Sequence, residues 1–241
     1  EEMMISVCMA TYNGEKYIQQ QIESILNQIG NEDELIISDD MSKDRTLDIV
    51  KSFNDSRIKI YIHEEEHGFV KNFENALSFA KGDYIFLSDQ DDLWMPDKIN
   101  ISLEYLNKYD FVVSDCITIN EEEQIISNSR IQDYNIKTGF WRLMIKTRYL
   151  GCCMAFNRKV LNAVLPFPKN DYLIEHDLWI ASVAECFFRT ALINKPLIKY
   201  RRHGKNVSSG GNGRGYCLAI KIYRRLYRLK CLIKLKIRLV V

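Results

Sequence analysis

The first part of the chain alternates short apolar runs with amphipathic segments. Residues 15–28 and 69–81 carry apolar side chains at the spacing of a helix. Apolar runs between and after these segments predict strands at residues 5–10, 34–38, 57–63, 83–88 and 111–119. Such alternation predicts an α/β fold with β-α-β units, in which helices flank an open, mostly parallel, Rossmann-like sheet.

Two further helices are predicted from their starting residues. Ser42 is expected to cap a helix with Asp44 in its first turn, and Pro96 is expected at the first turn of another.

The last part of the chain, from Cys217, predicts a basic amphipathic tail. One apolar stripe has helical spacing and consists of Ile222, Leu226, Leu229, Ile233, Ile237 and Val240. A helix lying on an anionic membrane surface is the favoured interpretation. A helix packed on the domain or on another subunit is an alternative, and the alternation of residues 232–239 also allows a strand.

Composition sets the class of protein. With 241 residues, 46% of them hydrophobic and only 4 prolines, the chain is long and apolar enough to bury the core of one domain. We expect no signal peptide, because no basic-then-apolar segment begins the sequence, and no membrane span. The 7 cysteines lack paired C-x-x-C spacing, so a reducing cytoplasm fits better than zinc or disulfides.

The net charge of +1 hides an asymmetry. The chain from Lys199 onward has 13 basic residues and no acid, so residues 1–198 carry a net charge of −12. The basic part lacks a recognised nucleic-acid-binding module, so a nucleic-acid partner is not expected.

Polar loops follow the first four predicted strands, at residues 11–15, 39–40, 67–72 and 89–92. Ligands of open parallel sheets bind outside the carboxyl ends of the strands, so these loops are expected to form one site.

The acids of these loops restrict the ligand. Neither the glycine pattern of dinucleotide-binding folds nor a P-loop is present. A diphosphate would be repelled by Asp89 and Asp91 unless a divalent cation, Mn²⁺ or Mg²⁺, lay between them. A solvated turn is the alternative interpretation of these two residues.

Five segments, in order over about residues 4–208, resemble landmarks of glycosyltransferase family 2. They read SVCMATYNGEKYIQQQIESILNQ, IISDDMSKDRT, AKGDYIFLSDQDDLWMPDKI, EHDLW and YRRHGKNVS. They are most similar to the bacterial rhamnosyl- and galactosyltransferase-like members. This resemblance implies a GT-A fold, a nucleotide-diphospho-sugar donor, a divalent metal and inversion at the anomeric carbon.

The resemblance also implies roles for single residues. Asp40, or less favoured Asp39, would accept a hydrogen bond from a pyrimidine base. Asp91 would bind the metal, with Asp89 near both ribose and metal, and Asp92 would have a supporting or capping role. The other expected nucleotide-binding residues are Thr11, Tyr12, Glu15, Asn72 and Gln90, and His203 would complete the metal shell unless it is simply exposed.

Transfer with inversion needs a carboxylate to take the acceptor's proton. Asp177 aligns with that base, although the sequence without the resemblance favours a helix cap at this position. His176 would orient Asp177 or contact the acceptor. Gly151 and Trp179 are also placed at the acceptor, whereas core packing is the alternative for Trp179, Trp141 and Tyr149.

Arg201, Arg202 and Lys205 either pair with the diphosphate in a closing loop or are solvated, and residues 210–215 give that loop flexibility or act as a linker. We divide the chain into a catalytic domain at 1–208, with a nucleotide-sugar half (1–120) and an acceptor half (121–208), and a linker and tail at 209–241.

The expected function is sugar transfer from a UDP-hexose or dTDP-rhamnose to a glycan or lipid-linked acceptor in bacterial surface polysaccharide synthesis. The expected location is the cytoplasmic face of the cell membrane. A non-catalytic nucleotide-sugar-binding scaffold subunit is the alternative. A sugar nucleotidyltransferase is disfavoured, because the first loop lacks a Gly-rich, Arg-containing phosphate loop.

Overall fold

The structure is a computed structural model that describes residues 3–64, 68–146, 149–170, 172–204 and 217–240. All five predicted strands are confirmed within a residue or two of their expected bounds. The strands are β1 (Ile5–Thr11), β2 (Glu34–Asp39), β3 (Ile58–Ile62), β4 (Tyr84–Asp89), β5 (Leu93–Trp94), β6 (Phe111–Ile119), β7 (Ile125–Ser127), β8 (Met154–Asn157) and β9 (Thr190–Arg201).

These strands form one sheet in the order β3-β2-β1-β4-β8-β6-β9-β5, with β7 paired to β6. The half that contains β3, β2, β1 and β4 is entirely parallel. β8 runs antiparallel between β4 and β6, and β6 is parallel to β9. The predicted mostly parallel α/β sheet is therefore confirmed, with β8 antiparallel at its centre and β5 and β7 antiparallel to β9 and β6.

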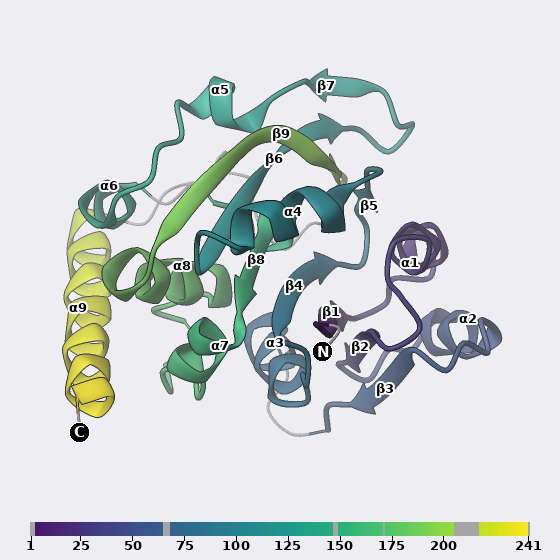
Figure 1. The fold of residues 1–241 in the computed structure, drawn as a ribbon, viewed down its shortest axis with the longest axis horizontal. Helices are drawn as coiled ribbons and strands as arrows, with labels where there is room; N and C mark the ends of the chain where they lie inside the picture. The colour runs from purple at the N-terminus through teal and green to yellow at the C-terminus, as the bar shows by residue number, and fades with distance from the viewer. Residues whose placement is uncertain (1–2, 65–67, 147–148, 171, 205–216, 241) are drawn as a thin grey trace.

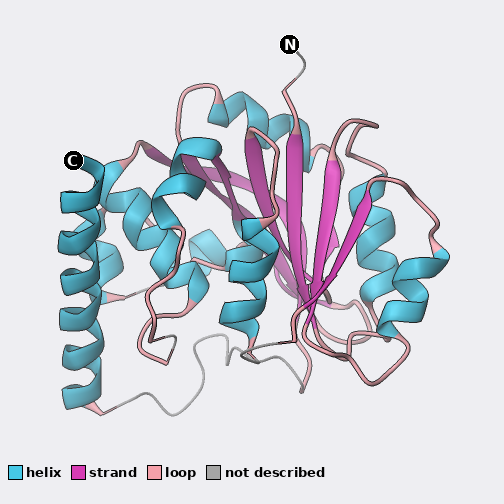
Figure 2. Cartoon of the chain, turned by 90° about the horizontal axis from the view of Figure 1, so that it is seen from below, coloured by secondary structure: helices cyan, strands magenta, loops and turns pink. Residues whose placement is uncertain are grey.

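Helices lie on both sides of this sheet (Figures 1 and 2). They are α1 (Ile18–Leu26), α2 (Thr46–Ser52), α3 (Phe69–Ser78), α4 (Lys98–Leu106), α5 (Arg130–Tyr134), α6 (Phe140–Ile145), α7 (Arg158–Val164), α8 (His176–Phe187) and α9 (Leu218–Val240), with a 3₁₀ turn at Gly151–Cys153.

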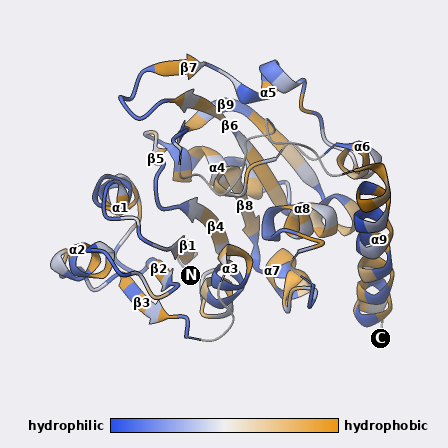
Figure 3. Ribbon diagram, turned by 180° about the vertical axis from the view of Figure 1, so that it is seen from behind, coloured by the Kyte–Doolittle hydropathy of each residue, from blue (hydrophilic) through white to orange (hydrophobic). Residues whose placement is uncertain are grey.

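The core follows from the hydrophobic pattern. β1, β2 and β4 are buried along nearly their whole length, as expected of parallel strands covered on both faces. The apolar stripe of α1 is buried against them, at Ile18, Ile22 and Ile25. Figure 3 shows the same pattern, with hydrophobic residues concentrated in the strands.

The predicted cap at Ser42 is wrong. α2 begins at Thr46, and Arg45 occupies the cap position. The Ser42 hydroxyl instead donates to the Asp39 carboxylate at 2.7 Å, and the Asp44 carboxylate accepts from the Thr46 amide at 3.0 Å. Ser42 is therefore held by the Asp39 carboxylate in the loop after β2 and does not cap the helix.

The tail is a helix, as predicted, so the alternative of a strand at residues 232–239 is wrong. α9 lies at one edge of the molecule beside α6 and α8 (Figure 1). Across the described ranges, none of the helices combines the length and the apolar character needed to span a bilayer. The linker residues 205–216 lie outside the described residues, so the division of the chain at residue 208 stays a prediction.

Candidate active site

The carboxyl ends of β1, β2 and β4 converge on one side of the molecule, where the polar loops gather (Figure 2). Strand register places Thr11 opposite Asp39, and Ala10 opposite Asp89. The sequence prediction that these loops share one edge is therefore confirmed. His67, in the third predicted loop, and Lys205 lie outside the described residues.

Asp39 holds the first two loops together. Its buried carboxylate accepts hydrogen bonds from the Thr11 hydroxyl, the Ser42 amide and the Ser42 hydroxyl, each at 2.7 Å. With both oxygens occupied, Asp39 has little capacity left for a ligand. Of the two neighbouring acids, Asp40 is the one better placed to contact a base.

Asp40 lies between the second and third loops. One carboxylate oxygen accepts from the Gly68 amide at 2.9 Å, and the other is 3.6 Å from His63 Nδ1. The His63 amide donates to the Asp39 carbonyl, which extends this connection to the end of β3. A nucleobase entering here would meet an acid and an imidazole that are already held in place.

Gln90 joins the first loop to the fourth. Its amide accepts from the Tyr12 N–H and donates to the Tyr12 carbonyl, each at 3.0 Å. A Cβ at Gly14 would stand 2.3 Å from Gln90 Oε1, so only glycine allows this approach. Tyr12 itself is exposed and its ring is open to a ligand.

Asn72 and Glu15 also fix these loops. The buried Asn72 side chain donates to the Thr11 carbonyl at 3.0 Å, while its Oδ1 has no hydrogen-bond partner in the described part of the chain. Glu15 accepts from the Arg45 amide at 3.1 Å. The unsatisfied Asn72 oxygen is a candidate acceptor for a ligand.

Asp89 and Asp91 stand at the end of β4, with His203 from the segment after β9. The Asp91 carboxylate is 2.7 Å from His203 Nε2. Burial, followed by repulsion from Asp91 and Asp177, raises the pKa of Asp89 to about 8. The alternative of an exposed, isolated His203 is wrong, since its ring also stacks on Tyr17 with centroids 5.1 Å apart.

Asp92 has a structural position, as expected. It is buried, its Oδ1 accepts from the Arg201 amide at 3.0 Å, and its Oδ2 has no hydrogen-bond partner among the described residues. Burial, with repulsion from Asp91 and Asp89, raises the pKa of Asp92 well above the usual range. Negative charge is thus crowded at this edge, which favours a bound cation.

Both predicted roles of Arg201, pairing with a diphosphate and lying in solvent, are wrong. The side chain is 1% exposed and lies beneath the loop after β4. It donates to the Asp91 carbonyl at 3.0 Å and pairs with Glu123 at 3.2 Å, and its guanidinium lies 4.7 Å from the centre of the Tyr17 ring. Arg201 therefore supports the acidic loop from below and is neither solvated nor directed at a diphosphate.

Asp177 lies in the first turn of α8. The cap position of this helix is Glu175, so the alternative of Asp177 as the helix cap is wrong. Burial, with the nearby Glu175 carboxylate, raises the pKa of Asp177 to about 7. The Asp177 carboxylate also contributes to the raised pKa of Asp89, although about ninety residues of sequence separate the two.

His176 is buried between Phe73 and Gly151. Its ring stacks on Phe73 with centroids 4.1 Å apart, and a Cβ at Gly151 would stand 2.8 Å from its Nε2. Burial lowers the pKa of His176 to about 3, so the ring is neutral. Neither ring nitrogen has a hydrogen-bond partner in the described residues, so the predicted bond that would orient Asp177 is not seen.

Two of the aromatic residues considered for the acceptor belong to the core. Trp179 is buried and its indole N–H donates to the Val164 carbonyl at 2.8 Å, which argues against its predicted acceptor contact. Tyr149 is also buried, with its hydroxyl 2.6 Å from Glu185. Trp141 is exposed on α6.

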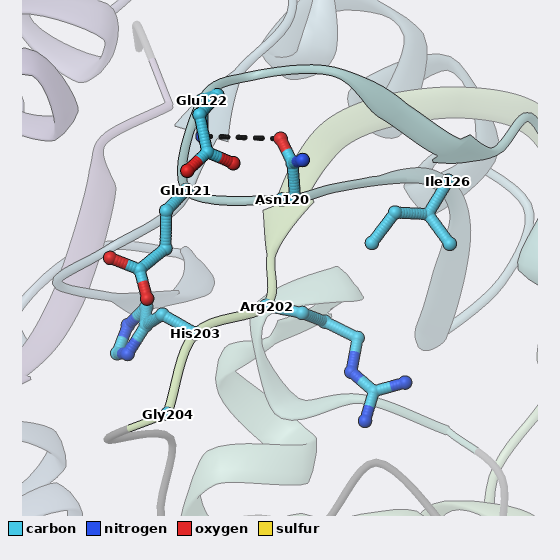
Figure 4. Close-up of a pocket in the computed structure, with 7 residues that line it drawn as sticks. All are labelled: Asn120, Glu121, Glu122, Ile126, Arg202, His203 and Gly204. Atoms are coloured by element: carbon cyan, nitrogen blue, oxygen red, sulfur yellow. Dashed lines mark hydrogen bonds between the residues drawn. The ribbon is translucent and has the colours of Figure 1, made fainter.

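A pocket of about 440 Å³ opens beside His203. In Figure 4, the Glu121 side chain extends toward His203, whereas Arg202 and Ile126 line the opposite side. Glu121 is also paired with Lys16 at 2.6 Å. Arg202 therefore faces an open polar space next to the predicted metal-binding residues.

The side chains present fit a hard divalent cation. Asp89, Asp92 and Cys152 have ligand atoms within 4.8 Å of one another. A hydrogen bond with Cys153, together with burial, raises the pKa of the Cys152 thiol well above its usual range, so a thiolate ligand is disfavoured. Beside them, Asp91 and His203 lie 2.7 Å apart and add a carboxylate and an imidazole, donors that suit Mn²⁺.

Two residues that were not predicted from the sequence, Gln21 and Tyr17, hold the candidate metal-binding residues in place. Gln21 on α1 donates to the Ser88 hydroxyl at 2.7 Å and to the Asp89 carbonyl at 3.1 Å. Tyr17 lies between Arg201 and His203. The polar Gln21 within an apolar helical stripe was a signal that could have been found.

Fold and site together define an α/β protein with polar, acid-rich loops at the carboxyl ends of its parallel strands. The sequence model described as Glycosyl transferase family 2 matches residues 6–165. The chain belongs to glycosyltransferase family 2, and it is a glycosyltransferase.

Curated relatives extend this similarity over most of the chain. UDP-Glc:alpha-D-GlcNAc-diphosphoundecaprenol beta-1,3-glucosyltransferase WfgD of Escherichia coli is 30% identical over 219 residues, 87% of this chain and 81% of the relative. The dTDP-rhamnosyl transferase RfbG of Shigella flexneri is 30% identical over 213 residues, 82% of this chain and 72% of the relative.

Solved structures share the fold. TarS (residues 1–349) of S. aureus in complex with UDP has a TM-score of 0.67 at 21% identity, covering 83% of this chain and 61% of that one. The mannosyltransferase PcManGT from Pyrobaculum calidifontis, in complex with GDP-Man and Mn²⁺, has a TM-score of 0.60 at 18% identity, covering 98% and 74%. The GT-A fold expected from the sequence is thereby confirmed.

Proposed function

We propose that this chain is an inverting, metal-dependent glycosyltransferase of bacterial surface polysaccharide synthesis. Its donor would be a UDP-hexose or dTDP-rhamnose, and its acceptor a hydroxyl of a glycan or lipid-linked sugar. The donors in the names of the two curated relatives, UDP-Glc and dTDP-rhamnose, support this range. The position and pKa of Asp177 carry the proposal.

Asp177 is proposed as the general base. A base works best when its pKa lies near the working pH, and burial places that of Asp177 at about 7. Its carboxylate shares the site with Asp89, where the donor would bind. Asp177 would take the acceptor proton as the hydroxyl attacks the anomeric carbon from the side opposite the leaving diphosphate.

Asp91 and His203, with Asp89, are proposed to hold Mn²⁺ or Mg²⁺. A divalent cation bound there would stabilise the negative charge on the departing nucleoside diphosphate. The contact of 2.7 Å between Asp91 and His203 supports this set, because both side chains already converge. Gln21 and Arg201 would keep the backbone of this loop fixed during the reaction.

Base recognition is assigned to Asp40, since Asp39 is fully occupied within the protein. An Asp40 oxygen would accept the N3–H of a pyrimidine, which fits either uracil or thymine. Thr11, Glu15 and Gln90 would shape this pocket through their contacts within and between the loops. Tyr12 would offer its exposed ring to the base, and Asn72 its free oxygen to the nucleotide.

The acceptor is proposed to approach past Gly151 and His176. The His176 ring is neutral and buried beside Gly151, and its nitrogens, which have no hydrogen-bond partner among the described residues, would bond a sugar hydroxyl that reached them. A lipid-linked acceptor would place the enzyme at the inner face of the cell membrane.

Replacing Asp177 with Asn tests this function. We expect turnover to fall by about 10²-fold or more while donor affinity stays within about twofold, because only the proton acceptor is lost. Glu175→Gln is the matched control, since Glu175 is the neighbouring acid but pairs with Arg224. Normal turnover in Asp177→Asn would remove this residue from the mechanism.

A further inference from the structure

α9 has two faces of different chemistry. Its inner face packs on the domain through the buried residues Arg228, Leu232 and Leu235. Its outer face carries a row of apolar residues, Ile222, Leu226, Ile233 and Ile237, which are 46–62% exposed. We call this row the outer stripe. The helix is thus buried on one side and strongly apolar on the side that faces solvent.

The inner face uses arginine to fasten the helix. Arg225 and Arg228 donate to the Met144 carbonyl at 2.8 and 3.2 Å, at the end of α6. Carbonyls at the end of a helix have no partner within the helix and carry partial negative charge, so they suit these guanidinium groups. Arg238 makes the same kind of contact with the Ala163 carbonyl in α7, at 2.6 Å.

Lysines, in contrast, border the outer stripe. Lys230, Lys234 and Lys236 are exposed, and the chain from residue 199 to its end contains no acid. At 100° per residue, Lys230 and Lys234 fall on one side of the stripe and Lys236 on the other. An apolar row with basic borders is the arrangement of helices that lie in a membrane interface.

We propose that the outer stripe of α9 docks on an anionic membrane surface, with its bordering lysines on lipid headgroups. Residues 1–198 carry −12, so an anionic surface would repel the body and attract α9, which fixes the orientation of the molecule. A second copy of this chain is a less suitable partner for the outer stripe, because two stripes packed face to face would bring the bordering lysines of both copies together.

This docking would also place the acceptor. Arg224 of α9 donates to the Leu173 carbonyl at 3.0 Å and pairs with Glu175 at 3.1 Å, just before Asp177. The membrane-facing helix is therefore fastened directly to the segment that carries the proposed base. The inference adds a membrane partner to the proposed function and rests on it only for the identity of the acceptor.

Flotation of the whole chain with vesicles tests the docking. We expect binding to phosphatidylcholine vesicles containing about one third phosphatidylglycerol, and little binding to pure phosphatidylcholine. Each lysine near an anionic surface strengthens binding about fivefold, so K230E/K234E should weaken it by about 25-fold or more. L226S/I233S should weaken it at least about tenfold, through lost apolar burial.

Ile125→Ser is the matched control, because Ile125 is 58% exposed but lies on β7. This variant should bind vesicles like the parent chain. Equal binding of L226S/I233S, or equal binding to neutral and anionic vesicles, would overturn the proposal. So would a dimer in light scattering that L226S/I233S converts to monomer.

Failure of the docking is distinguishable from failure of the proposed function. Asp177→Asn should bind anionic vesicles normally, since Asp177 lies away from the outer stripe. L226S/I233S should transfer sugar to a water-soluble acceptor at the parent rate. A stripe variant that loses vesicle binding and this soluble activity together would show general damage and count against the proposed surface.

Discussion

Replacing Asp177 with Asn should stabilise the fold while it removes activity. Ionised Asp177 lowers the free energy of unfolding at neutral pH, because burial and Glu175 raise its pKa from 3.8 to about 7. A difference of about three units, at 1.36 kcal/mol each, sets an upper bound of about 4 kcal/mol. Because the carboxyl is only partly buried, we expect about 1–2 kcal/mol after solvent screening.

The sign and pH window follow from the two pKa values. Below pH 3.8 the carboxyl is protonated in both folded and unfolded chains, so Asn gives no advantage. The unfolded chain ionises first as pH rises, so the gain grows toward pH 7 and is constant above it. In a chain of this length, 1–2 kcal/mol corresponds to a Tm increase of about 2–8 °C.

The assay is thermal unfolding at pH 5 and pH 8, with EDTA present so that no cation neutralises the site. We expect a larger Tm increase for Asp177→Asn at pH 8 than at pH 5. Glu175→Gln should show a smaller increase, because it removes the lesser cause of the raised Asp177 pKa and also breaks the pair with Arg224. An unchanged or lower Tm at pH 8 would show that Asp177 is not held under electrostatic strain.

Three further predictions concern neighbouring residues. Arg201→Ala should cost about 1–3 kcal/mol in the free energy of unfolding measured with urea, because the Asp91 carbonyl would lose its buried donor, whereas the ion-pair partner Glu123 is exposed; a cost no larger than that of Arg202→Ala would contradict its supporting role. Gly151→Ala should lower turnover by about tenfold or more with donor KM unchanged, because its Cβ would meet His176 at 2.8 Å. Gly30→Ala is the control, because its Cβ would lie 3.4 Å from Asp33 Oδ2, an ordinary contact, and equal kinetics of the two variants would refute the steric argument. Asp91→Ala and His203→Gln should each weaken nucleotide binding in Mn²⁺ but not in EDTA, as measured by calorimetry; equal losses in both buffers would exclude a shared metal role.

The parallel half of the fold was predictable from local pattern. β1, β2 and β4 are apolar runs, and α1 repeats isoleucine at helical spacing. The secondary structure of each segment can therefore be predicted from its own residues. The convergence of the loops then follows from the topology. The family resemblance added the distant Asp177, which no local pattern connects with Asp89.

The second half of the fold was harder to predict, because its strands are formed through pairing with strands that are distant in the sequence. β8 has four residues and lies between β4 and β6, and β9 contains Lys195 and Pro196, which interrupt an apolar pattern. Arg201 is an example at the site, since burial of an arginine reflects Asp91, Glu123 and Tyr17 arriving from other segments. On α9 four residues of the predicted stripe, Ile222, Leu226, Ile233 and Ile237, are exposed, and the opposite side, with Arg228, Leu232 and Leu235, packs on the domain.

The central claim is sugar transfer from a nucleotide donor with inversion, and the most direct test is to follow the reaction by NMR. The purified chain would be incubated with Mn²⁺, a lipid-linked acceptor and, in turn, several UDP-hexoses and dTDP-rhamnose, while anomeric protons are recorded. We predict release of one nucleoside diphosphate that depends on acceptor, and a product of inverted anomeric configuration. A product that retains the donor configuration would contradict the account, as would no turnover of any donor.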